Sequence, residues 1–357
     1  MTRWIAGGTA AVVVAFVAIT YLGIHDREIP RAALEAKYAT PPSQFAVLAD
    51  GTRVHYRDRG PRDAPVLVLL HGFSGSLFVW ETWSVELSQP LADAPRNATH
   101  SRPGDLELQG GSYVLMETAA GNHGTGSIEQ QMVEAFENAR AFLSGYRVIS
   151  LDLPGHGLTG AVPSGDYSQA AMTEMLKQFA DRLGLKRFAL AGNSMGGGVA
   201  ARFAETYPDR VTHLILIDAD GARTGTRPRL HLARLAAWTP LIDRWFLHAL
   251  WSRTTELSHM QGTSRAMLAH FRLPDDPYVW LHAKQIRAPT LILWGGEDHT
   301  IPVASAYAWQ KAIPGSKLIV YPHAQHVSMV DAPNSARDVR AFLAGEAGAK
   351  LGAKLGH

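Results

Sequence analysis

The sequence predicts an α/β fold in which a doubly wound, mostly parallel sheet carries helices on both faces. Three observations predict it. Continuous apolar runs such as residues 66–70 and 290–294 are typical of strands buried on both faces. Amphipathic segments alternate with these runs along the chain. A glycine-rich turn, Gly192-Asn193-Ser194-Met195-Gly196, lies between one apolar run and a predicted helix.

The elements follow in a regular order. Residues 31–42 predict a short polar helix and a linker that stops at Pro41-Pro42. Residues 44–48 and 52–57 alternate apolar and polar around Asp50-Gly51, which predicts a hairpin. The predicted buried strands are residues 66–70, 146–153, 188–191, 213–218, 290–294 and 317–321. The predicted helices are one beginning near Leu77, then residues 170–183, 199–207, 303–313 and 334–343.

Composition narrows the class of protein. A chain of 357 residues, 46% hydrophobic, can bury a large core in one domain with insertions. A formal charge of +2 gives no basis for a nucleic-acid partner. The chain contains no cysteine, which excludes disulfides, a thiolate nucleophile and cysteine-bound metal.

The amino terminus departs sharply from this composition. Residues 4–24 carry no charged side chain and are long enough to span a bilayer. We therefore expect residues 1–25 to be a transmembrane anchor, residues 26–43 a linker and residues 44–344 the main domain, on the periplasmic or extracellular side. The alternative is a cleaved signal peptide and an exported soluble form, but Ile19-Thr20-Tyr21-Leu22 lacks a small-x-small cleavage site.

Two stretches interrupt the alternation of strand and helix. Residues 84–138 are rich in proline and glycine and predict an insertion, either a flap or a disordered loop. Residues 221–287 are rich in helix formers and aromatics and predict a helical cap or lid. Each ring taken alone fits simple packing against the main domain, whereas together they indicate an apolar lid over a pocket. The rings are Trp238, Trp245, Phe246, Trp251, Phe271 and Trp280. Residues 345–357 predict a flexible tail.

The G-x-S-x-G turn is the first candidate for chemistry. A serine hydroxyl becomes a nucleophile only when a base takes its proton, and a tight strand-to-helix turn pushes Ser194 out toward such a base. Gly192 and Gly196 are small because the turn brings the backbone close to neighbouring strands. The alternative is an ordinary glycine-rich loop.

An acid and a base follow later in the chain. Asp298 comes just after the predicted strand 290–294, and His326 comes after the last predicted strand. The order Ser, Asp, His is the order that such sheets use. His323 is a rival base, and we prefer His326 because it lies farther beyond its strand. Asp218 and Asp220 are rival acids, and we prefer Asp298 because a Gly-Gly-x-Asp turn is the commoner site.

Four motifs together resemble the α/β-hydrolase fold superfamily. They are His71-Gly72-Phe73, Asp152-Leu153-Pro154-Gly155-His156-Gly157, Gly192-Asn193-Ser194-Met195-Gly196-Gly197 and Gly295-Gly296-Glu297-Asp298. The chain is similar to the membrane-anchored bacterial esterases and monoacylglycerol-lipase-like hydrolases of that superfamily, from about residue 44 to 343 apart from the first insertion.

The resemblance implies a role for each matching residue. Ser194 would be the nucleophile, His326 the general base and then acid, and Asp298 the carboxylate that orients the imidazole. The backbone N–H groups of Phe73 and Met195 would form the oxyanion hole. The sequence departs from the family at Gln325, where a glycine usually precedes the histidine.

The flanking polar residues have structural interpretations. We expect His71 and His156 to hydrogen-bond their own loops, Asp152 to support the sheet edge and Glu297 to face solvent.

The sequence therefore predicts a serine carboxylic-ester hydrolase that works through an acyl-enzyme, with no metal or organic cofactor. Short- to medium-chain acyl esters or monoacylglycerols are the expected substrates. A carbon–carbon bond hydrolase of ring-cleavage products is the alternative, since Gly-Asn-Ser-Met-Gly-Gly is frequent there, although Phe73-Ser74 and Val327 differ from that group. A perhydrolase and a catalytically silent membrane binding module stay open, as does the oligomeric state. Ser194 stands where a dehalogenase or epoxide hydrolase needs aspartate.

Overall fold

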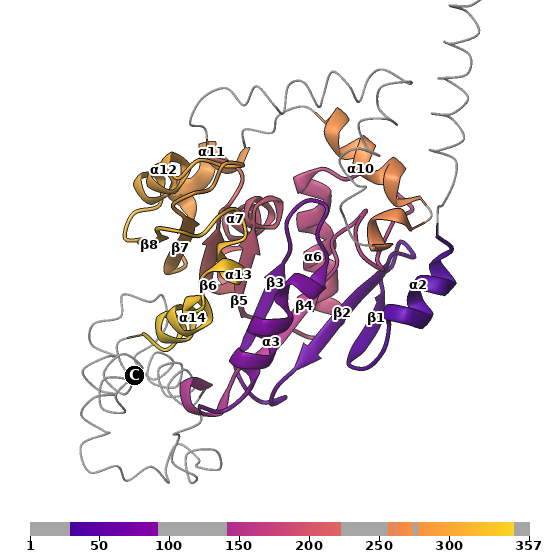
Figure 1. Cartoon of the computed structure of the whole chain (residues 1–357), viewed down its shortest axis with the longest axis horizontal. Coiled ribbons are helices and arrows are strands. Elements are labelled where there is room, and N and C mark those ends of the chain that lie inside the picture. Colours follow the sequence, from indigo (N-terminus) through magenta and orange to yellow (C-terminus); the bar gives the residue numbers. More distant parts are fainter. Residues whose placement is uncertain (1–28, 92–140, 223–255, 261, 274–277, 346–357) are drawn as a thin grey trace, which may run out of the picture.

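The core of the molecule is one twisted sheet between two layers of helices (Figure 1). The computed structural model describes residues 29–91, 141–222, 256–260, 262–273 and 278–345. Within them lies an 8-stranded sheet of order β1-β2-β4-β3-β5-β6-β7-β8. β1 pairs with β2, and β2 with β4, in antiparallel fashion, whereas the remaining neighbours are parallel. The predicted doubly wound, mostly parallel sheet is confirmed.

The bounds of the elements match the predicted runs closely. The strands are β1 Ser43–Val47, β2 Arg53–Arg59, β3 Val66–Leu70, β4 Arg147–Leu151, β5 Phe188–Asn193, β6 Val211–Ile217, β7 Thr290–Gly295 and β8 Lys317–Tyr321. The α-helices are α2 Arg31–Tyr38, α3 Glu81–Ser88, α6 Gln169–Arg182, α7 Met195–Thr206, α10 Thr263–Arg272, α11 Tyr278–His282, α12 Ala304–Ala312, α13 Ser328–Asp331 and α14 Ser335–Leu343. The 3₁₀ turns are η1 Leu77–Trp80, η2 Pro208–Arg210, η3 Glu256–His259 and η4 Ala283–Gln285.

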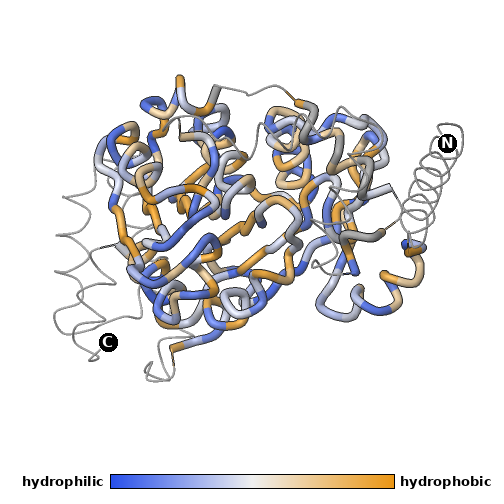
Figure 2. Tube along the Cα trace, turned by 45° about the horizontal axis from the view of Figure 1, so that its top comes forward, coloured by the Kyte–Doolittle hydropathy of each residue, from blue (hydrophilic) through white to orange (hydrophobic). Residues whose placement is uncertain are grey.

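Each central strand feeds two hydrophobic cores because its side chains alternate between the faces of the sheet. In β3, Val68 and Leu70 enter the core beneath α6, α7 and α12, while Leu67 and Leu69 enter the core beneath α3 and α14. All four side chains are fully buried. In Figure 2 the hydrophobic segments accordingly run through the interior of the fold. Burial on both faces explains why these strands are continuous apolar runs in the sequence.

Three boundaries differ from the sequence prediction. α7 begins at Met195 rather than near 199. Glycines are poor helix formers, so propensity alone predicts a later start, but close packing with neighbouring strands requires glycines in the first turn of this helix. β2 runs on to Arg59, two residues beyond the predicted strand 52–57, because it pairs with β4. Ser84 to Ser88 belong to α3, so the first insertion begins after them. Most of that insertion, residues 92–140, lies outside the described residues.

The described part of the predicted cap packs directly on the main domain. His270 of α10 stacks on Phe73 with ring centroids 5.2 Å apart, and Trp280 of α11 meets Trp309 of α12 edge to face at 6.1 Å. Residues 223–255, which include Trp238, Trp245, Phe246 and Trp251, lie outside the described residues, and so does the side chain of Phe271. The second insertion therefore lies against the loop that carries Phe73.

The predicted anchor and most of the tail lie outside the description. Residues 1–28 and 346–357 are not described, so the anchor stays a prediction. Across the described segments between residues 29 and 345, no helix has the length and apolar character needed to cross a bilayer.

Candidate active site

Ser194 forms the turn between β5 and α7. Its backbone has φ 53° and ψ −119°, a left-handed conformation that a residue with a side chain rarely adopts. Such strain costs on the order of 1–3 kcal/mol and is typical of a nucleophile raised on a sharp turn. The turn is the one that the sequence motif predicts.

The flanking glycines are required by space. A Cβ at Gly192 would lie 2.2 Å from the carbonyl oxygen of Gly196. A Cβ at Gly196 would lie 2.5 Å from the carbonyl oxygens of both Leu70 and His71. These contacts are with backbone, which cannot move aside without shifting the strand end. The predicted reason for small residues on either side of the serine is therefore confirmed.

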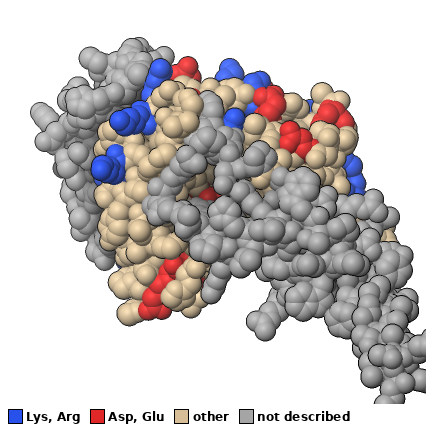
Figure 3. All heavy atoms as spheres, turned by 90° about the horizontal axis from the view of Figure 1, so that it is seen from above, with Lys and Arg blue, Asp and Glu red and all other residues tan. Residues whose placement is uncertain are grey.

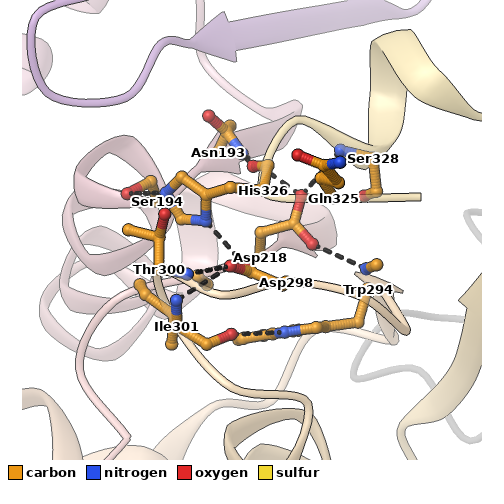
Figure 4. Close-up of polar contacts among 12 residues, drawn as sticks. Asn193, Ser194, Asp218, Trp294, Asp298, Thr300, Ile301, Gln325, His326 and Ser328 are labelled. Atoms are coloured by element: carbon orange, nitrogen blue, oxygen red, sulfur yellow. Dashed lines mark hydrogen bonds and ion pairs between the residues drawn. The ribbon is translucent and has the colours of Figure 1, made fainter. Parts of the chain in front are cut away.

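Ser194, His326 and Asp298 form one hydrogen-bonded chain (Figure 4). The Asp298 carboxylate accepts from His326 Nδ1 at 2.8 Å, so the proton on the ring lies at Nδ1. The other nitrogen, Nε2, then accepts from Ser194 Oγ at 2.9 Å. An imidazole held in this tautomer can take the hydroxyl proton as the oxygen attacks an electrophile.

The loop after β7 fixes the carboxylate. Asp298 is buried, and its Oδ1 accepts from the backbone N–H groups of Thr300 at 2.7 Å and Ile301 at 2.9 Å. Its Oδ2 is left to face His326. One oxygen therefore anchors the side chain and the other orients the base.

The rival base and the two rival acids take no part in this hydrogen-bonded chain. The side chain of His323 is 92% exposed and faces Glu297, which is itself exposed as predicted. Asp220 accepts from the N–H of Gly221 at 2.7 Å. Asp218 is buried near His326 but hydrogen-bonds backbone, at 2.9 Å from the N–H groups of Gly295 and Ser328. The geometry favours His326 and Asp298 over all three.

The two expected oxyanion donors lie beside the nucleophile. Met195 is the first residue of α7, so its N–H has no acceptor within the helix. A Cβ at Gly72 would lie 3.1 Å from Ser194 Cβ, which places the loop with Phe73 against the serine. Their role as donors stays a prediction.

A buried polar network supports this loop, as expected. Asp152 contacts His55 Nδ1 at 2.7 Å and accepts from the N–H groups of Leu77 at 2.7 Å and Leu158 at 2.8 Å. Burial, the largest single effect, opposes its ionisation, but the hydrogen bond and charge of His55, the nearby His71 and the N–H of Leu77 together outweigh burial and lower the pKa of Asp152. His71 donates from Nδ1 to Gly72 O at 2.7 Å, and its Nε2 accepts from Leu153 N at 3.0 Å.

Sequence reasoning missed the residues that join these loops. Asn193 donates from Nδ2 to the carbonyl oxygen of His326 at 3.2 Å, and Asp218 accepts from two loops at once. The sequence does not reveal this role, because both side chains contact backbone groups of distant loops. For Asp218, the one feature visible in the sequence is an acidic residue directly after a predicted strand.

Comparison with known proteins agrees with this geometry. The sequence profile described as alpha/beta hydrolase fold matches residues 120–267 and 254–333. The chain belongs to the alpha/beta hydrolase fold family.

Known proteins resemble this chain at low identity. A 2-hydroxymuconate semialdehyde hydrolase of Pseudomonas putida is 31% identical over 56% of this chain and 77% of its own. The dihydrolipoyllysine-residue acetyltransferase component of the acetoin cleaving system of Cupriavidus necator is 28% identical over 82% of this chain, which spans only 66% of that relative.

Solved structures share the fold. A membrane phospholipase A, 22% identical, has a TM-score of 0.57 and covers 97% of this chain and 99% of its own. A carboxylesterase of Bacillus subtilis, 18% identical, has a TM-score of 0.54 and covers 88% of this chain and 96% of its own. Esterases and carbon–carbon bond hydrolases thus both occur among the similar proteins.

Proposed function

We propose that this hydrolase is a serine carboxylic-ester hydrolase acting through an acyl-enzyme. The observation that carries the proposal is the unbroken chain from Ser194 Oγ through His326 to Asp298, with contacts of 2.9 and 2.8 Å. A non-catalytic binding module has no need of a strained serine, an oriented base and a buried acid in one line.

The proposed reaction assigns each of these residues a step. Ser194 Oγ attacks the ester carbonyl carbon while its proton passes to His326 Nε2. Asp298 stabilises the resulting imidazolium, and the N–H groups of Phe73 and Met195 stabilise the oxyanion, each worth about 3 kcal/mol of barrier. His326 returns the proton to the leaving alcohol, the acyl group stays on Ser194, and water activated by His326 releases the acid.

Acyl esters or monoacylglycerols of short to medium chain are the substrates we propose. The cap supports this choice, since aromatic residues such as Phe73 and Trp280 join it to the main domain. On the face in Figure 3, the positive and negative side chains of the described residues are interspersed with neutral ones.

Hydrolysis of p-nitrophenyl esters tests the function. We expect Ser194→Ala to lose activity by about 10⁴-fold or more, because the nucleophile is absent. Ser164→Ala, which alters an exposed serine, is the matched control and should retain the wild-type rate. A fluorophosphonate probe should label the wild type and the control but not Ser194→Ala. Equal ester hydrolysis by Ser194→Ala and wild type would contradict the proposal.

Carbon–carbon bond hydrolysis is a second candidate because of one observation. The 2-hydroxymuconate semialdehyde hydrolase shares 31% identity with this chain, and such an enzyme acts on a ring-cleavage product. A substrate panel containing esters, monoacylglycerols and ring-cleavage dienes decides between the two. A kcat/KM about 100-fold higher for the dienes than for any ester would assign the second function.

For location, we propose that the full chain is held at a membrane by residues 4–24, with the hydrolase domain on the periplasmic or extracellular side. The absence of any charged side chain in that run supports the proposal. Substrates with acyl chains partition into bilayers, so a tethered ester hydrolase would meet them there.

A further inference from the structure

Asp218 lies at the centre of the three loops that carry the candidate triad. It follows β6, is fully buried and has a positive φ of 45°. Its Oδ1 accepts from the N–H of Gly295 at 2.9 Å, and its Oδ2 accepts from the N–H of Ser328 at 2.9 Å. Gly295 begins the loop with Asp298, and Ser328 lies two residues beyond His326. One carboxylate therefore links the acid loop to the base loop (Figure 4).

The third loop joins through Asn193, the neighbour of the nucleophile. Its Nδ2 lies 3.5 Å from Asp218 Oδ2 and donates to the carbonyl oxygen of His326 at 3.2 Å. The backbone adds a further tie, since Ser194 N donates to Ile217 O at 2.9 Å, one residue before Asp218. The nucleophile, the base and the acid are thus all connected at this one buried group.

We propose that Asp218 is a positioning residue for hydrolysis, whose carboxylate holds the Asp298 and His326 loops in register with Ser194. The proposal rests on the ester hydrolase function given above. Asp218 acts through the three triad residues and does not touch the substrate. A shift of about 1 Å in such a triad is enough to cost about 100-fold in rate.

A carboxylate suits this position better than an amide. Each carboxylate oxygen of Asp218 accepts from one backbone N–H. A side-chain amide has only one oxygen, so its NH₂ group would face the second N–H, and two donors cannot form a hydrogen bond with each other. Burying a carboxylate is costly. Burial raises the pKa of Asp218 to about 7, although the N–H groups of Ser328 and Gly295 and the nearby His326 act against this. A buried carboxylate that accepts from both loops is therefore suited to hold them together.

A second readout separates positioning from substrate binding. A fluorophosphonate reacts with Ser194 without the ester substrate, so its labelling rate reports how well Ser194 is aligned with His326. A residue that positions these side chains should therefore affect kcat and labelling together and leave KM nearly unchanged.

Asp218→Asn is the test, with the full chain and p-nitrophenyl esters. We expect kcat to fall about 10- to 100-fold with KM changed less than about twofold, because geometry and not substrate binding is altered. Fluorophosphonate labelling of Ser194 should slow in parallel with kcat. Asp220→Asn makes the same change two residues away and should leave kcat within about twofold of wild type.

The outcomes separate the two proposals. Asp218→Asn with wild-type kcat, or with a wild-type rate of fluorophosphonate labelling, overturns the positioning role. If Asp218→Asn gives no cooperative unfolding transition, Asn193→Ala replaces it and should lower kcat about 10-fold, and a wild-type kcat there overturns the role as well. Full activity in Ser194→Ala removes the hydrolase function, whereas an inactive Ser194→Ala beside a fully active Asp218→Asn removes only the role of Asp218.

Discussion

Ser194 is held in its strained backbone conformation by three hydrogen bonds from or to its own peptide groups. Its N–H donates to Ile217 O at 2.9 Å, and its carbonyl accepts from Gly198 N at 3.1 Å and Asp220 N at 2.9 Å. A net contribution of about 1 kcal/mol for each bond is comparable with the cost of the positive φ. The serine is therefore preorganised before any substrate arrives.

His156 provides a prediction at the same scale. Its Nδ1 donates to Pro154 O at 2.9 Å, and its Nε2 is buried without a hydrogen-bond partner among the described residues. Burial, with a smaller effect of nearby His71, lowers the pKa of His156 to about 3. The unfolded chain then binds more protons at this residue between pH 6.5 and about 3, so stability is lost as pH falls through that window.

Urea unfolding at pH 7.5 and pH 5 measures the effect. His156 lowers the free energy of unfolding at pH 5 by about 2 kcal/mol relative to pH 7.5. In His156→Asn the amide can still donate to Pro154 O. We expect its free energy of unfolding to fall by about 2 kcal/mol less than that of wild type between pH 7.5 and pH 5. His323→Asn, at a side chain that is 92% exposed, is the control and should keep the wild-type pH dependence. An identical loss in wild type and His156→Asn would contradict the prediction.

The triad could be predicted from sequence because its chemistry requires particular residue types directly after buried strands. Ser194, Asp298 and His326 each follow an apolar run. Asp218 could be predicted only as a rival acid, because its proposed positioning role depends on which backbone N–H groups the fold brings to it. Tertiary contacts with backbone leave no pattern in a single sequence.

At the scale of the element, the start of α7 shows where propensity misleads. Gly196, Gly197 and Gly198 are poor helix formers, so the sequence predicts a helix that begins after them. In the structure the helix already includes them, and Gly197 would place a Cβ 2.5 Å from Ala219 Cβ. Close approach of α7 to the ends of β3 and β6 requires glycine and outweighs propensity.

Gly196→Ala tests that packing. The new Cβ would meet the carbonyl oxygens of Leu70 and His71 at 2.5 Å, so the end of β3 and the loop that carries Phe73 must shift. We expect a loss of about 1–3 kcal/mol in the free energy of unfolding and a larger proportional loss of kcat. Gly198→Ala is the matched control in the same first turn of α7. Its Cβ meets the far end of the Gln169 side chain at 2.6 Å, and that flexible side chain can move aside. Gly198→Ala should change stability by less than about 1 kcal/mol, and equal losses in both variants would refute the packing argument.

At the scale of the whole molecule, the amino-terminal linker is joined to the cap. Ile29 bridges Met260 in parallel, and Lys37 pairs with Glu256 at 2.7 Å. Leu34 is buried in a small core with Leu158, Leu257 and Met260. The sheet and α2 could be predicted because their patterns are local, whereas this docking joins segments more than 200 residues apart and has no local signature.

The same contacts bear on the anchor. Ile29 lies only a few residues beyond the apolar run 4–24, so a membrane-held chain would carry the cap close to the lipid surface.

Extraction of cell membranes with alkaline carbonate checks the anchor. We expect the full chain to stay in the membrane pellet, because transfer of about 20 apolar residues out of lipid is strongly unfavourable. A chain that lacks residues 1–25 is the control and should be released. Intact mass of the purified protein separates the alternatives, since a cleaved signal peptide would remove the apolar run and leave a soluble exported hydrolase, contrary to the proposed location.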